Sequence, residues 1–140
     1  MSRPILQPVL GLVLWSLVVM VWMITTRVAA MNKAKLDLSI VGARGQSLEG
    51  VVPDVVQWKS HNYNHLMEQP TLFYAVAVVL ALVAPGDEWS LSLAWAYVGL
   101  RNVHSVYQAT VNVVRVRGTI FTLASVVLIA LALRAATFVF

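Results

Sequence analysis

The sequence predicts an all-α integral membrane protein, a bundle of four transmembrane helices that forms one domain over residues 1–140. Of the 140 residues 59% are hydrophobic and only 11% are charged, and the mean hydropathy is +0.77. A soluble domain of this length could not bury so much apolar surface, because its surface-to-volume ratio is too high. The apolar residues also gather into blocks of about 20 residues, the length that a helix needs to cross a bilayer core.

The expected helices follow one another with connections of unequal length. They are placed at residues 9–30, 60–84, 89–112 and 119–137. Pro8 suits the start of the first helix. The first loop, 31–59, is the only long connection, and the Pro85-Gly86 pair marks a tight turn between the second and third helices.

Basic residues predict the orientation in the membrane. They gather in the first and third loops, whereas the second loop has two acidic residues and no basic one. We therefore expect the first and third loops in the cytoplasm and both termini on the opposite side. The scattered excess of four positive charges fits loops that face anionic lipid better than it fits nucleic acid. The first apolar block is expected to span the membrane and not to be cleaved, because Arg27 and two lysines follow it like a stop-transfer flank.

The second expected helix carries a polar stripe. His61, His65 and Glu68 recur at spacings of four and three, which places them on one face, and Asn62 and Gln69 flank them. Ionisable side chains are costly in hydrocarbon, so such residues usually face the inside of a bundle or a wet cavity. The stripe therefore predicts an internal polar cleft near the cytoplasmic side.

The third expected helix carries a matching stripe. Arg101, His104 and Gln108 recur at spacings of three and four, and Tyr107 borders them. Since the two helices form an antiparallel hairpin, the stripes can face each other, with Arg101 and His104 as partners for Glu68.

Equal rise along this hairpin, which turns near Gly86, predicts the depth of each residue. Glu68 comes level with Ser105, and His65 comes level with Gln108. Two interpretations of the facing stripes stay open. They bind a ligand, or a Glu–Arg pair holds the helices together without one.

A metal site is a weaker interpretation of the same residues. His61, His65 and Glu68 could present three ligands, with His104 as a fourth. Any polar helical stripe creates this spacing, however, and the chain has only three histidines. We therefore expect no metal. Because the chain has no cysteine, it has no thiol nucleophile of its own.

Two stretches resemble the MAPEG family, the membrane-associated proteins of eicosanoid and glutathione metabolism. They are HNYNHLMEQPTLFY, which begins at His61, and LRNVHSVYQATVNVVRVRG, which ends at Gly118. The resemblance covers most of the chain and is nearest to a bacterial branch, so the inner membrane is expected. It implies a homotrimer of four-helix subunits, glutathione bound in a cleft between subunits, and a lipophilic second substrate from the bilayer.

The resemblance also implies roles for single residues. Glu68 matches the glutamate that holds glutathione, and Arg101 matches the arginine of the third helix. Arg117, or as a second choice Arg115, is placed like the arginine that activates the thiol. The other residues expected at the cofactor are His61, Asn62, His65, His104, Tyr107 and Gln108.

The chain departs from the family pattern at two of these positions. His65 stands where glutathione-binding members usually have Asn, and His61 where they often have Arg. The expected function is a glutathione-dependent transferase or peroxidase acting on a lipophilic electrophile, with an arginine stabilising the thiolate. The alternative is a non-enzymatic four-helix protein that binds a lipid, an anionic ligand or a membrane partner through the same cleft. A small multidrug exporter fits less well, because the first helix has no carboxylate.

Overall fold

The computed structural model is a bundle of long helices, described for residues 3–37, 39 and 45–140. Its elements are α1 (Leu6–Lys33), the short 3-10 helix η1 (Gly45–Leu48), α2 (Asp54–Glu68), α3 (Pro70–Val83), α4 (Glu88–Thr110) and α5 (Val114–Val139). The described residues contain no strand. The predicted all-α class is therefore confirmed.

Three stretches of the described chain are long and apolar enough to cross a membrane. They are α1, the continuous run of α2 and α3 over Asp54–Val83, and α5. In the most apolar windows of α1 and α5 only 17% of the residues are buried, so their hydrophobic side chains face outward. The fourth rod, α4, is 23 residues long, and the polar residues in its second half lower its hydropathy.

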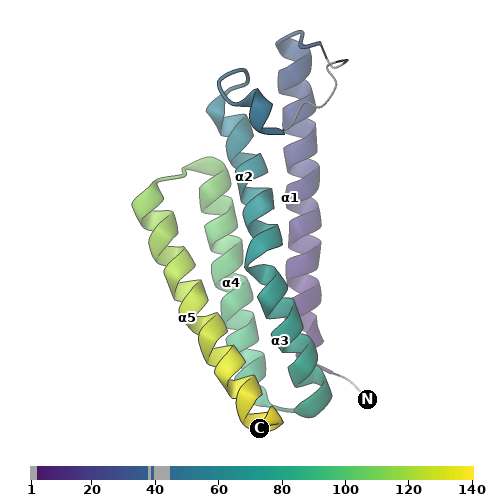
Figure 1. Ribbon diagram of the computed structural model, residues 1–140, viewed down its shortest axis with the longest axis vertical. Coiled ribbons are helices and arrows are strands. Elements are labelled where there is room, and N and C mark those ends of the chain that lie inside the picture. Colours follow the sequence, from purple (N-terminus) through teal and green to yellow (C-terminus); the bar gives the residue numbers. More distant parts are fainter. Residues whose placement is uncertain (1–2, 38, 40–44) are drawn as a thin grey trace.

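The helices run side by side along one long axis (Figure 1). α2 and α3 follow one another as one rod, and both termini lie at the end that carries the α3–α4 turn. At the other end α1 and α2 extend beyond the α4–α5 turn. α4 contacts α1, α2 and α5. The stripe of Arg101, His104 and Gln108 is buried by these contacts, as expected for residues that face the inside of a bundle.

Leucine, alanine, valine and aromatic side chains make up most of the apolar core. Phe73 of α3 stacks on Tyr97 of α4 with ring centroids 4.7 Å apart, and both are fully buried. Several alanines are buried in this core, and small residues are common where helices pack inside a membrane. The fully buried alanines are Ala77, Ala94, Ala109 and Ala124.

The rod of α2 and α3 is interrupted at Gln69. Pro70 has no N–H and stands at the first position of α3, so regular helical hydrogen bonding stops before it. The Gln69 side chain accepts a hydrogen bond from the Tyr97 hydroxyl at 3.2 Å and donates one to the Ser125 hydroxyl at 2.7 Å. The interruption is thus tied to both α4 and α5.

This interruption accompanies a register that differs from the predicted one. The Asn62 amide donates to the Ser105 hydroxyl at 2.9 Å, and the His65 ring stacks on His104. The prediction had placed His65 level with Gln108 and Glu68 level with Ser105. It was wrong by about one turn, because it assumed two straight helices of equal rise.

Candidate functional site

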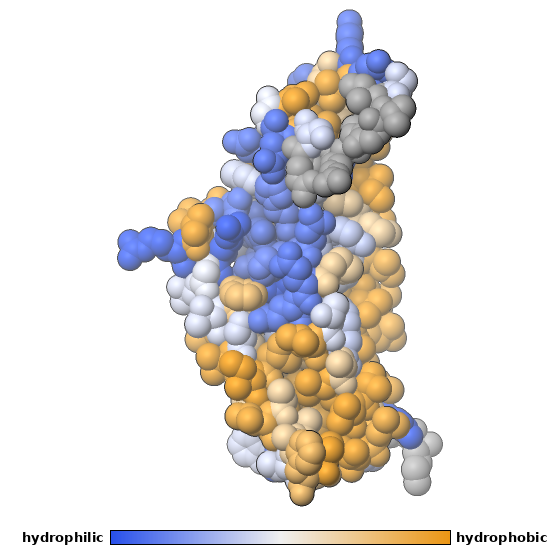
Figure 2. Space-filling view, in the orientation of Figure 1, coloured by the Kyte–Doolittle hydropathy of each residue, from blue (hydrophilic) through white to orange (hydrophobic). Residues whose placement is uncertain are grey.

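A pocket of about 230 Å³ lies where α2, α4 and the start of α5 meet. Its lining residues are His65, His104, Gln108, Val114, Arg117, Gly118 and Phe121. We call it the arginine pocket. It lies in the half of the bundle where hydrophilic residues gather over α2 and the α4–α5 turn, whereas the half toward the termini is hydrophobic (Figure 2). None of the residues that line it carries a carboxylate.

Aromatic rings build one wall of the arginine pocket. The rings of His65 and His104 stack with centroids 5.0 Å apart, and Phe121 meets His65 edge-on at the same distance. These stacked and edge-on contacts fix the orientation of the two imidazole rings. The His104 Nδ1 is buried without a hydrogen-bond partner among the described residues.

Arg101 lies beneath these rings and has no exposed surface. Its Nη2 donates to the His65 carbonyl at 2.9 Å and lies 3.2 Å from the His65 Nδ1. Its Nε and Nη1 are buried without a hydrogen-bond partner in the part of the chain that the structure describes. Since a guanidinium stays charged, these are unpaired donors of a buried cation, and Arg101 itself does not line the arginine pocket.

Arg117 is the second cation of the arginine pocket. It is half-buried in the first turn of α5, and its Nη1 donates to the Asn112 side-chain oxygen at 2.8 Å. Arg115, two residues earlier, is exposed and lines a separate open groove with Thr119 and Thr122. Of the two arginines that the sequence offered for thiol activation, the structure therefore brings only Arg117 to the pocket.

The predicted Glu68–Arg101 pair is not formed. The ion pairs among the described residues join His61 to Glu49 and Arg134 to Asp87. Glu68 is exposed at the last position of α2. Because the register is shifted by about one turn, His65 takes the place opposite Arg101 that the prediction gave to Glu68.

His61 and Asn62 do not line the arginine pocket. His61 is exposed and lies 3.1 Å from Glu49, beside a second pocket of about 260 Å³ between α1 and α2. Asn62 is buried and meets Ser105, which also accepts a hydrogen bond from the Trp15 indole at 2.9 Å. Helical spacing predicted one shared face, but His65 alone of these residues reaches the arginine pocket.

Of Gln108 and Tyr107, only Gln108 lines the arginine pocket. Gln108 is buried and lines the arginine pocket, whereas Tyr107 is half-buried and outside its lining. Within the described residues no three of His, Cys, Asp and Glu are grouped closely enough to hold a metal ion.

Sequence reasoning missed two residues of this region. Phe121 stands in an apolar helix, where nothing in the sequence separates a pocket wall from a lipid-facing side chain. Asn112 lies at the end of the third expected helix, and neither polar stripe included it. A signal was available, because an asparagine at the end of a helix pattern often marks a left-handed C-terminal residue.

The chain was also compared with known proteins. The model of the MAPEG family matches residues 5–137, nearly the whole chain. The chain belongs to the MAPEG family. The resemblance seen in the two polar stretches is thereby confirmed. Together with the three apolar spans, membership makes this MAPEG chain an integral membrane protein. Neither the comparison with curated proteins nor that with solved structures returned a match.

Proposed function

We propose that this MAPEG protein is a glutathione-dependent transferase or peroxidase that acts on a lipophilic electrophile in the membrane. One observation carries the proposal. Arg117, His104 and Gln108 gather around a single pocket lined by no carboxylate, and the buried Arg101 next to His65 keeps two donor atoms without a partner among the described residues. Family membership supports glutathione as the cofactor.

The chemistry of the residues fits this ligand. Glutathione has two carboxylates, and guanidinium groups bind carboxylates through paired hydrogen bonds. Arg117 at the pocket suits one of them, and the unpaired Nε and Nη1 of the buried Arg101 would suit the other if ligand binding made them accessible. A cation such as Arg117 beside a thiol favours the thiolate, which is the reactive nucleophile. Since the chain has no cysteine, the bound glutathione would supply the thiol.

The proposed assembly is a homotrimer in which each site lies between two copies. Glu68 and Asn64 are exposed on α2, outside the arginine pocket. An ionised side chain is costly against lipid, and it is tolerated where another copy covers it. A neighbouring subunit could in this way bring Glu68 to a ligand that one subunit holds only in part.

The proposed topology has α4 as a fourth span and the α1–α2 and α4–α5 connections in the cytoplasm. The support is that basic residues lie in or beside these two connections, Lys33, Lys35 and Arg44 at the first and Arg115 and Arg117 in the first turn of α5, whereas the α3–α4 turn has none. Single cysteines at Val51 and Gly86, in a chain with no cysteine of its own, test this assignment. Labelling of Gly86→Cys from the cytoplasmic side would reverse it.

Replacing Arg117 and Arg115 separately tests the proposed function. Glutathione is titrated into the purified protein, and the ultraviolet absorbance of the thiolate is followed together with the heat of binding. Arg117→Ala should lower the thiolate signal and the turnover by about tenfold or more, as when an enzyme loses one charge-stabilising donor. Arg115→Ala removes the same charge from the neighbouring groove and should behave like the wild type.

The wild-type protein decides between the two classes of function. Saturable glutathione binding with a thiolate signal supports the enzyme. A well-folded protein that binds no glutathione would overturn the proposal, and would favour the non-enzymatic protein that binds another anion through the same cleft.

A further inference from the structure

We infer that Asn112, in the turn between α4 and α5, is a positioning residue that aims Arg117 into the arginine pocket. The inference rests on the proposed function, because it concerns the arginine that would stabilise the thiolate. It assigns a task to a residue that neither the polar stripes nor the family resemblance singled out.

The backbone conformation of Asn112, two residues after the last residue of α4, stops the helix from continuing. Its φ is +57°, in the left-handed region that few residues other than Gly and Asn adopt readily. The N–H groups of Val111 and Asn112 both donate to the Tyr107 carbonyl, at 2.9 Å each. The chain then reverses within three residues and starts α5 at Val114. The turn therefore has a defined shape.

A buried lysine holds the same helix end from the side. Lys59 of α2 donates to the Ala109 carbonyl of α4 at 3.2 Å and to the Val55 carbonyl at 2.7 Å. Positive charge is favourable at the C-terminal end of a helix, where carbonyl groups lack partners. The turn that carries Asn112 is thus anchored both by its own backbone and by α2.

The side chain of Asn112 connects this anchored turn to Arg117. Its oxygen accepts a hydrogen bond from the Arg117 Nη1 at 2.8 Å. An arginine side chain has several rotatable bonds, so an unbound guanidinium would sample many positions. The bond to Asn112 uses one corner of the guanidinium and leaves Nη2 and Nε to face a ligand.

Asparagine meets two requirements at once. It tolerates the left-handed backbone, and its amide oxygen is neutral, so it holds the guanidinium without offsetting the charge. Glycine would keep the backbone and remove the oxygen. Aspartate would keep both the backbone and the bond, but its charge would compete with the thiolate for Arg117.

These differences define the experiment. The pH dependence of thiolate absorbance is measured with bound glutathione for the wild type, Asn112→Gly, Asn112→Asp and Arg117→Ala. Asn112→Gly should lower the thiolate fraction near neutral pH by about fivefold, the size of one hydrogen bond of ordinary strength, because the guanidinium remains but is no longer held in place. Asn112→Asp should lower it further although the bond persists. Melting temperatures show whether either variant loosens the turn.

A double variant separates positioning from a structural role. Asn112→Gly should add nothing in the Arg117→Ala background, because residues that act through one another are not additive. Additive losses, or an Asn112→Gly titration equal to that of the wild type, would overturn the inference. A wild type that forms no thiolate overturns the proposed function itself, and the inference with it, so the two failures are distinguishable.

Discussion

Arg101 is completely buried, and two of its donor atoms have no partner among the described residues. Replacing it should therefore affect stability and ligand binding in opposite directions. A buried cation without a carboxylate costs free energy, and apolar residues of similar size are often neutral or stabilising in such places. Arg101→Met should therefore leave the melting temperature unchanged or raise it. Glutathione binding should weaken by about tenfold or more, because a hydrogen bond to a charged group is lost. Thermal unfolding and calorimetric titration measure the two effects.

Arg134 offers a matched control for this prediction. It is bonded to Asp87 through both Nε and Nη2, so Arg134→Met leaves a carboxylate unpaired and should lower the melting temperature. An Arg101→Met protein that melts below Arg134→Met would show that Arg101 is mainly a structural residue.

The three residues whose burial the sequence predicted correctly share one property. Arg101, His104 and Gln108 lie on a helix that other helices surround, so its polar stripe had to be internal. The stripe of α2 has less cover, and His61 and Glu68 emerge at the surface. Helical spacing tells which residues share a face, but not how far a neighbouring helix covers that face.

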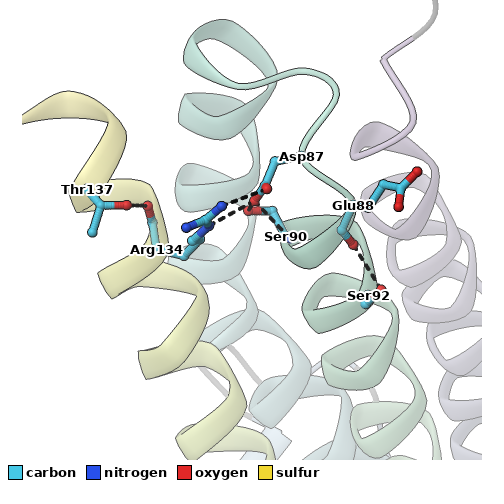
Figure 3. Close-up of polar contacts among 6 residues, drawn as sticks. All are labelled: Asp87, Glu88, Ser90, Ser92, Arg134 and Thr137. Atoms are coloured by element: carbon cyan, nitrogen blue, oxygen red, sulfur yellow. Dashed lines mark hydrogen bonds and ion pairs between the residues drawn. The ribbon is translucent and has the colours of Figure 1, made fainter.

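The start of α4 contacts the end of α5 at the end of the bundle that carries both termini, and this contact can also be tested. Asp87 precedes α4, accepts a hydrogen bond from the Ser90 N–H at 3.1 Å, and meets Arg134 of α5 (Figure 3). The Arg134 and Ser90 hydrogen bonds hold the pKa of the Asp87 carboxyl below its ordinary value of 3.8. One carboxylate thus both starts α4 and fixes the far end of α5.

The sign of the pH effect follows from this lowered pKa. The carboxyl binds a proton more readily in the unfolded chain, so its contribution is present above pH 3.8 and is lost as the pH falls below that value. The variant Asp87→Asn would still start the helix, because asparagine is also a good N-terminal residue.

Asp87→Asn should therefore cost about 1 kcal/mol or less at neutral pH, since the pair is partly exposed and screened. The difference from the wild type should shrink toward about pH 3. Melting temperatures of both proteins across this range measure it. A difference that grows as the pH falls would contradict the assignment.

Helix breaks were the least predictable feature of the elements. The block at 60–84 was expected as one helix, but the structure starts it at Asp54 and divides it at Gln69. Pro70 indicates in the sequence that the helix is interrupted. The hydrogen-bond partners of the Gln69 side chain, Tyr97 and Ser125, belong to other helices. Pro70 sets where the break falls, and these contacts with α4 and α5 could not be predicted from spacing within one helix.

The bundle as a whole leaves an ionisable side chain, Glu68, exposed within an apolar span, and this predicts that copies associate. We expect trimers in lipid nanodiscs by native mass spectrometry. Glu68→Lys should shift the population toward monomers, because it reverses the charge at the covered surface. Glu68→Gln keeps the shape, so it should retain the trimer while weakening glutathione binding.

Glu88 supplies the control at the opposite end of the bundle. It is exposed in the first turn of α4, beside the α3–α4 turn, where water can solvate it. Glu88→Lys should leave the trimer intact. A wild type that stays monomeric, or an equal effect of both charge reversals, would mean that Glu68 faces lipid headgroups instead of a neighbouring copy. The exposed glutamate would then lie at the membrane surface, and the arginine pocket of a single subunit would have to hold the whole ligand.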